Sequence, residues 1–379
     1  SASVVTLSLG ARVDVINNTV STTSGIGGGG VVLYSQNTRL DVHGIGTQLV
    51  IQSNTAQQGG GVVVLEASLA ISLGARLDVI DNTAAYRNGG GILLQSQSTL
   101  DVTGLGTRLV VHGNTAEQAG GGFLVLSASV VTLSLGARVD AINNTAVTTS
   151  GGGLFLQDQN TGLDVDGTGT RLVIQGNSAR NNAGGMIAQA ASSVIISSGA
   201  CVDVINNTVA FNGGGLYLHS QDSRLDVSGT GTRLLVQGNS AGQKGGGVAA
   251  LMASSVIISL GARVDVIDNT AVTLAGGGIY LRDQNTRFDV SGMGTRLLVQ
   301  GNTAKQHGGG VAIVSNAILR STSSSIFQSN TALNGNGGGL AYDDDGGTAD
   351  GGPNCVSLAL HIKYDGTYNV DENGVQKSA

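Results

Sequence analysis

The alternation of apolar and polar residues predicts short β-strands along almost the whole chain. Between residues 91 and 114, three runs alternate with a period of two: 91–97, 98–104 and 107–113. Each run is bounded by Gly, Ser or Asn, which is typical of strands with one buried face. No window combines a period of 3.6 with helix-capping residues. The pattern therefore predicts an all-β protein.

This unit of three runs is repeated along the chain. An Asn follows the third run of each unit, with a mean spacing of about 31 residues: Asn18, Asn54, Asn82, Asn114, Asn144, Asn177, Asn207, Asn239, Asn269, Asn302 and Asn330. A repeat of this length indicates a solenoid. We predict a single-stranded right-handed parallel β-helix with three strands per coil and about eleven coils. At about 4.8 Å per coil, the rod would be roughly 50 Å long.

Two kinds of coil alternate, which gives a super-repeat of about 62 residues. One kind carries G-x-G-T-[RQ]-L, as at 104–109, and the other carries S-x-G-A-[RC]-[VL]-D, as at 134–140. We predict a solenoid over residues 1–340, followed by an acidic loop, a terminal coil and a cap or linker over 341–379. Residues 2–14 nearly repeat 128–140, so we expect further coils upstream in a longer protein.

The Asn and Gly residues of the repeat are best explained as structural. Asn tolerates left-handed backbone angles at a corner and can bond backbone groups, and stacked Asn side chains can form an internal ladder. Gly permits positive φ and close approach of neighbouring backbones. An active site needs one unique constellation, whereas the Asn occurs eleven times. The alternative is a row of ligand-binding amides, which the eleven copies of the Asn disfavour.

Composition indicates an extracellular protein. Charged residues make up 12% of the chain and hydrophobic residues 40%, so Ser, Thr, Asn and Gln must supply most of the polar surface. This is common in extracellular β-solenoids. The net charge of −6 argues against general nucleic-acid binding. The chain has no run of about 18 apolar residues, so no membrane helix is predicted.

Two short motifs of the repeat resemble those of a known family. Phe327-Gln-Ser-Asn330 matches the motif FxxN, and the runs Gly59-Gly-Gly-Val62 and Gly276-Gly-Gly-Ile279 are similar to GGA[ILV]. These motifs are those of the polymorphic outer-membrane protein (Pmp) repeats of chlamydial autotransporters, and the resemblance covers about residues 10–340. It implies an extracellular β-helical passenger that serves in adhesion or surface structure.

The strand before each ladder Asn carries the most informative surface. Counted back from the Asn, positions −3 and −5 should point inward, whereas −2, −4 and −6 should point outward. Position −6 is mostly Arg, −4 alternates Asp with Val or Leu, and −2 alternates Ile with Gln or His. We predict one of two roles for this face. It is either a solvated surface on which the Asp offset the charge of the Arg, or a contact face for another solenoid or an acidic glycan. The binding residues of such a contact face would be Arg76, Arg108, Arg138, Arg171, Arg233, Arg263, Arg296, Ile80, Ile142 and Ile205.

The carboxylates do not favour an enzyme. A second Asp series recurs on every second coil: Asp41, Asp101, Asp164, Asp226 and Asp289. Pectinolytic enzymes share the β-helix fold, but they need a local Asp cluster that occurs once. The five His have no metal-ligand spacing, and Trp is absent. Thr follows the Asn as a single column, which disfavours an ice-binding face. We predict a non-enzymatic protein, with a pectinase-like enzyme acting on polysaccharides as the alternative.

Three smaller features carry further predictions. Asp343, Asp345 and Asp350 lie in an acidic loop that could bind Ca²⁺ through its oxygens, or could simply be solvated; no other cofactor is expected. Asn17, Asn143 and Asn206 begin sequons, which are glycosylation acceptors or chance occurrences in an Asn-Thr-rich repeat. Cys201 replaces an outward Arg, and Cys355 lies about five coils away, too far for a mutual disulfide. Each would be free or would pair between molecules.

Together these observations predict an extracellular or cell-surface β-solenoid that is a building block of a fibre, layer or adhesin. It would act through lateral or glycan contacts along its outer face. The expected partners are copies of itself, other structural proteins or acidic glycans, with no nucleic acid and no membrane insertion in this segment.

Overall fold

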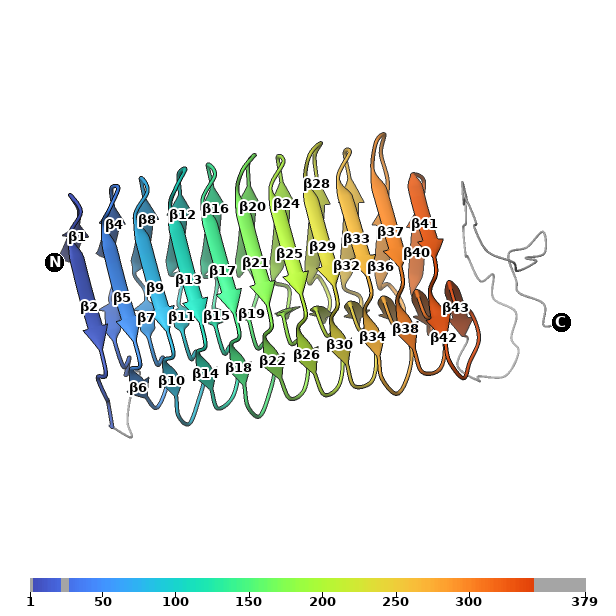
Figure 1. Ribbon diagram of the computed structural model, residues 1–379, viewed down its shortest axis with the longest axis horizontal. Coiled ribbons are helices and arrows are strands. Elements are labelled where there is room, and N and C mark those ends of the chain that lie inside the picture. Colours follow the sequence, from blue (N-terminus) through green and yellow to red (C-terminus); the bar gives the residue numbers. More distant parts are fainter. Residues whose placement is uncertain (1–2, 22–26, 344–379) are drawn as a thin grey trace.

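The computed structural model describes residues 3–21 and 27–343, and these residues form a straight parallel β-solenoid (Figure 1). Every strand pairs in parallel with the equivalent strands of the coils before and after it, so that the strands stack into four sheets that run along the rod. The predicted all-β solenoid of about eleven coils is confirmed, with the ladder Asn spaced by about 31 residues.

Sheets A and B hold the second and third predicted strands of each coil. Sheet A consists of β1 (Ser3–Leu7), β4 (Thr38–His43), β8 (Ser68–Ser72), β12 (Thr99–Thr103), β16 (Val130–Ser134), β20 (Gly162–Asp166), β24 (Ser193–Ser197), β28 (Arg224–Ser228), β32 (Ser255–Ser259), β36 (Arg287–Val290) and β40 (Ile318–Ser321). Sheet B consists of β2 (Arg12–Ile16), β5 (Gln48–Gln52), β9 (Arg76–Ile80), β13 (Arg108–His112), β17 (Arg138–Ile142), β21 (Arg171–Gln175), β25 (Cys201–Ile205), β29 (Arg233–Gln237), β33 (Arg263–Ile267), β37 (Arg296–Gln300) and β41 (Ser324–Gln328).

Sheet C was not predicted as a sheet, because its strands are only two residues long and directly follow the ladder Asn. It consists of β6 (Thr55–Ala56), β10 (Thr83–Ala84), β14 (Thr115–Ala116), β18 (Thr145–Ala146), β22 (Ser178–Ala179), β26 (Thr208–Val209), β30 (Ser240–Ala241), β34 (Thr270–Ala271), β38 (Thr303–Ala304) and β42 (Thr331–Ala332). Each coil thus has three longer strands and a fourth short one at the corner, which the prediction of three strands per coil did not include.

Sheet D completes the coil after the glycine-rich loop. It consists of β3 (Val31–Tyr34), β7 (Val62–Leu65), β11 (Ile92–Gln95), β15 (Phe123–Leu126), β19 (Leu154–Gln157), β23 (Met186–Gln189), β27 (Leu216–His219), β31 (Val248–Leu251), β35 (Ile279–Arg282), β39 (Val311–Val314) and β43 (Leu340–Asp343). One continuous core of stacked Val, Leu and Ile runs through the rod, with few aromatic residues.

The ladder Asn is buried and has all its hydrogen-bonding groups satisfied. The Nδ2 of Asn82 donates to the carbonyl of Ile51 in the preceding coil (2.9 Å) and to Oδ1 of Asn114 in the next (3.0 Å). The backbone N–H of Asn82 also donates to that Oδ1 (2.9 Å). The same pattern recurs along the rod, and the nine ladder Asn from Asn54 to Asn302 are at most 1% exposed. The stacked Asn side chains thus form a ladder of hydrogen bonds inside the rod.

The three glycines after sheet C are required by the spacing of the coils. Gly120 has a φ of +68°, which favours a residue without a Cβ. A Cβ on Gly121 would lie 2.6 Å from the carbonyl oxygen of Gly152 in the next coil, and one on Gly122 would lie 2.5 Å from that of Gly153. Both contacts are too short for a Cβ. The Gly-Gly-Gly run therefore lets successive loops stack backbone on backbone.

The alternation of two coil types has a hydrogen-bonding reason at the corner between sheets A and B. The Oγ1 of Thr107 accepts the N–H of Gly74 from the preceding coil (2.9 Å), and Thr170 does the same for Gly136 (3.0 Å). Thr occupies this buried corner in one coil type and Ala in the other. Each G-x-G-T coil thus accepts a backbone hydrogen bond from the S-x-G-A coil before it.

The domain boundary predicted at residue 340 is not tested by the described residues. They end at Asp343, so the predicted terminal coil and cap lie outside them.

We expect Asn144→Ala to destabilise the rod strongly. It would leave the N–H of Asn114 and the carbonyl of Val111 without their partners, and each buried unsatisfied group costs about 1–3 kcal/mol. Thermal unfolding followed by circular dichroism should show a much lower Tm. The control is Asn143→Gly, because Asn143 is exposed with a φ of 55° and glycine occupies the same position in neighbouring coils. An equal loss in both variants would contradict the ladder's role.

Candidate functional site

The outer face of sheet B is the predicted contact face, and its side chains are more buried than the sequence indicates. Positions −3 and −5 lie in the core, as predicted. Position −4 points away from the core, and Asp14 in the first coil is exposed. In the nine coils that follow, however, the side chains at this position are only 0–9% exposed: Val50, Asp78, Val110, Asp140, Val173, Asp203, Leu235, Asp265 and Leu298. The predicted exposure of this column is wrong. Equivalent residues of the adjacent coils and the −6 and −2 columns on either side enclose each side chain.

The predicted apolar ribbon on sheet B is correspondingly less exposed than expected. Ile80, Ile142 and Ile205 at position −2 are half-buried, and the Val and Leu of position −4 are buried. These residues stabilise the sheet by packing along the rod axis, and little of their apolar area is left for a partner. The checkerboard of Ile and Val is therefore a poor candidate for the contact face.

The Arg column of sheet B is largely neutralised by the buried Asp column. The Oδ1 of Asp140 lies 2.8 Å from Nε of Arg138, and its Oδ2 lies 2.7 Å from Nη2 of Arg108 in the preceding coil. Asp265 is held in the same way by Arg263 and, at 3.7 Å, by Arg233. A buried carboxylate needs such partners to offset its desolvation. The guanidinium groups thus serve mainly to pair with the buried carboxylates. This weakens the hypothesis that an acidic glycan binds along the Arg column.

Besides Gln48, which takes the place of Arg and donates from its Nε2 to Asp78 at 2.9 Å, two positions break the pattern of this column. Cys201 takes the place of Arg, so that Asp203 pairs only with Arg171 of the preceding coil, at 2.6 Å. Arg296 has a buried Nε for which the described part of the chain offers no hydrogen-bond partner, because Ile326 occupies the −4 position of the next coil. Both are local exceptions and form no cluster.

The structure shows an exposed apolar surface that the sequence analysis missed. It lies at the tip of the turn between sheets A and B, along the upper edge of the rod in Figure 1. Large apolar side chains occupy this tip in seven coils, with exposed fractions from 66% to 98%: Leu9, Ile45, Leu73, Leu105, Leu135, Leu260 and Met293. We call these seven residues the apolar ridge. The polar residues Thr168, Ser198 and Thr230 occupy the tip in the three coils between.

The apolar ridge contributes nothing to the core, and two columns of different chemistry flank it. The sheet A side carries a column that is interrupted by His43 and Asp166 and is otherwise mostly hydroxyls: Ser72, Thr103, Ser134, Ser197, Ser228 and Ser259. The sheet B side carries the Arg column. The sequence signal for the ridge was an aliphatic residue at x of S-x-G and G-x-G, a turn position where a polar residue is the usual choice.

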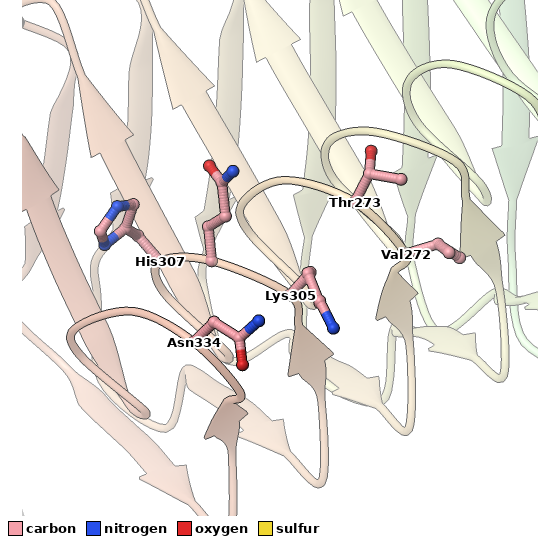
Figure 2. A pocket seen from close by; sticks show the side chains of 6 residues that line it. Val272, Thr273, Lys305, His307 and Asn334 are labelled. Carbon is pink, nitrogen blue, oxygen red and sulfur yellow. The ribbon is translucent and has the colours of Figure 1, made fainter.

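A second surface feature is a shallow hollow between three of the loops that join sheets C and D (Figure 2). The loop 305–310 has six residues, whereas the loops 272–278 and 333–339 on either side have seven, so that the middle loop leaves a notch. The notch has a volume of about 540 Å³, within the range of small-ligand sites. It is lined by Val272, Thr273, Lys305, Gln306, His307 and Asn334.

Donor groups predominate in the notch. Lys305 contributes an ammonium group, and none of the six lining residues is acidic. The Nδ1 of His307 lies 3.1 Å from the backbone N–H of Asn336 and accepts from it, which leaves Nε2 to carry the proton of a neutral ring. Such a site suits a ligand with anionic or hydroxyl oxygens.

The middle-strand Asp series contains one pair of carboxylates that does not repeat. Burial raises the pKa of Asp164 on β20, and the neighbouring charge of Asp166 adds to this. Hydrogen bonds from the hydroxyls of Ser197 (2.7 Å) and Ser198 lower the pKa of Asp166. Two carboxylates with pKa values pushed apart are the minimum for acid–base chemistry. This pair is what the enzymatic alternative has to rest on.

The remaining predicted sites have mixed outcomes. Asn17, Asn143 and Asn206 are exposed and accessible, so their glycosylation stays a prediction. Cys201 is half-buried and free, whereas Cys355, Asp345 and Asp350 lie outside the described residues. Within residues 3–21 and 27–343, no three His, Cys, Asp or Glu are placed to hold a metal ion. Over the same residues, no helix is long and apolar enough to cross a membrane.

Comparison with known proteins agrees with the resemblance seen in the motifs. Over 134 residues, or 35% of the chain, the sequence is 34% identical to the probable outer membrane protein pmp20 of Chlamydia pneumoniae. The chain spans about 7% of the length of that protein. No family model matches. Among solved structures, the hyper-glycosylated TibA55-350 fragment aligns with 89% of the chain and all of its own length, at 15% identity and a TM-score of 0.27.

The match to pmp20 confirms two of the predictions. The chain resembles the polymorphic outer-membrane proteins, and the match to an outer membrane protein agrees with a location at the cell surface.

We expect Asp164→Asn to stabilise the protein at neutral pH. Because the folded-state pKa of Asp164 is raised, the folded state prefers the neutral carboxyl, and its stability falls as the pH rises through that pKa. Asn cannot ionise, so the Tm of the variant should exceed that of the wild type near pH 7 and approach it near pH 3.

The control for this prediction has the opposite sign. The pKa of Asp166 is lowered, so its ionised form stabilises the fold above the ordinary pKa and this contribution is lost as the pH falls. Asp166→Asn should therefore lower the Tm slightly at pH 7. A lower Tm for Asp164→Asn at pH 7 would show that the carboxylate of Asp164 stabilises the fold.

Proposed function

We propose that this chain is a structural or adhesive β-solenoid of the cell surface that acts through side-on contacts along its outer surface, without catalysis. The observation that carries this proposal is the apolar ridge. Seven large apolar side chains stand out from one edge of the rod and take no part in its core. Exposed apolar patches beyond scattered single residues mark interaction sites, and this ridge runs along most of the rod.

The charge distribution supports the same function. The Arg and Asp columns of sheet B pair with each other, so they stiffen the rod and offset part of the positive charge on its flank. A rigid rod with one apolar edge presents the same contact at every coil, which suits a building block of a layer or fibre. The similarity to an outer membrane protein supports a contact of this kind at the cell surface.

Replacing Leu73, Leu105 and Leu135 by Ser should abolish side-on contact. All three are at least 66% exposed, so the fold and Tm should stay unchanged. Surfaces coated with the variant should lose both the attachment of cultured epithelial cells and the binding of soluble wild-type protein. The matched control replaces three exposed apolar residues by Ser that belong neither to the ridge nor to the notch: Tyr34, Tyr86 and Val147.

Two results would overturn the proposed function. One is a wild-type surface that binds neither cells nor soluble wild-type protein. The other is turnover of polygalacturonate that disappears in Asp164→Asn, which would establish the pectinase-like alternative instead.

The notch favours contact with acidic glycans as a second function. Lys305, His307 and Asn334 provide donors in a hollow of suitable size without an opposing carboxylate. The partly satisfied Arg column offers no such hollow. An acidic glycan would therefore be bound by the loops between sheets C and D, on the edge of the rod opposite the ridge (Figure 1).

We expect Lys305→Ala to weaken binding of polygalacturonate at least fivefold, since a charge-assisted contact contributes about 1 kcal/mol or more. Binding is measured on immobilised polygalacturonate, with dextran as the uncharged control, and should fall with salt. Lys244→Ala is the matched variant, because Lys244 lies over the ring of Tyr280, 5.0 Å from its centre, and does not line the notch. Equal binding by Lys305→Ala and wild type would rule out this site.

A further inference from the structure

We infer that the apolar ridge packs against a second copy of this chain, parallel and in register, about a two-fold axis that runs along the rods. This inference rests on the proposed side-on contact and specifies its partner. The first argument is that the spacing of contacts must match on the two partners. Two copies of one solenoid have the same rise per coil, so a contact made at one coil recurs at every other coil, which a globular partner cannot match.

The pattern of the turn tips fixes the register. In register, all seven ridge residues meet their own counterparts, and the polar Thr168, Ser198 and Thr230 meet theirs. A shift by one coil leaves five apolar pairs, and a shift by two coils leaves three. The polar interruption of the ridge therefore penalises every staggered arrangement.

The flanking columns fix the direction. A two-fold axis parallel to the rods turns one copy so that its sheet B side faces the sheet A side of the partner. Each Arg column then lies beside the partner's hydroxyl column, which includes Ser72, Thr103 and Ser134. In an antiparallel pair, sheet B faces sheet B, and the two Arg columns come together. The column has eight Arg against five Asp, so an excess of like charge repels, and at most five apolar pairs form, among the tips from Leu9 to Leu135.

The size of the contact is sufficient for a stable dimer. Ten turn tips at about 4.8 Å give a strip about 45 Å long. With the two flanking columns, the strip is about 15–20 Å wide, or about 800 Å² per copy, which is what a standard protein interface buries. The ridge supplies its apolar centre, and the hydroxyls and guanidinium groups supply its polar rim.

Disulfide cross-linking tests this arrangement directly. In a Cys201→Ser, Cys355→Ser background, the single-cysteine variants Leu73→Cys, Leu135→Cys and Leu260→Cys are oxidised with copper phenanthroline and run on a non-reducing gel. All three should form covalent dimers, because every ridge position faces its own counterpart. Leu333→Cys is the control, equally surface-placed but away from the ridge, and should not exceed background.

Two outcomes would overturn the inference. One is a cross-link between Ile45→Cys and Leu105→Cys when the two variants are mixed, together with self-cross-linking at Leu73→Cys alone, because this is the antiparallel pair. The other is a wild-type protein that sediments as a monomer at tens of micromolar. If the wild type is monomeric but the Leu73, Leu105 and Leu135 variant still loses cell attachment, the proposed function holds and the ridge has a different partner. Absence of both attachment and association would remove both.

Discussion

The stacking of coil on coil through the buried Asn is the interaction on which the rest of this structure depends. Each Asn ties its own coil to the coils on both sides, through Nδ2 and the backbone N–H toward the next coil and through Nδ2 toward the preceding carbonyl. These bonds hold the corner backbones close enough that Gly121 and Gly122 admit no Cβ. The parallel sheets, the continuous core and the straightness of the rod follow from that single spacing.

Much of this architecture could be predicted from the sequence, because each structural requirement is repeated in every coil. The alternation in 107–113 identified a strand of sheet B with the correct inward face, and the Asn gave the number of coils. The Thr-Ala strand after the Asn could not be recognised, since two residues show no alternation. The reason for the two coil types also needed the structure, because the acceptor of the Gly74 N–H is Thr107 from another coil.

The functional surface was harder to predict because side-chain direction and exposure are different properties. Asp140 does point outward, yet it is fully buried by Arg108, Arg138 and the neighbouring coils. In a sheet with partners on both sides, a short outward side chain is enclosed by longer ones. The turn tip has no such neighbours, so Leu105 at the tip is 86% exposed. Exposure in this solenoid is greatest at the tips of the turns, and counting outward positions along a strand cannot identify them.

A perfect repeat would leave a rod of this kind without any preferred alignment, since every coil would match every other coil equally well. The specificity of such a molecule must therefore come from the places where its repeat is broken. Thr168, Ser198 and Thr230 interrupt the ridge, the short loop 305–310 opens the notch, and Asp166 replaces a hydroxyl beside Asp164. The regular residues hold the scaffold together, and the exceptions among them distinguish one position along the rod from the next.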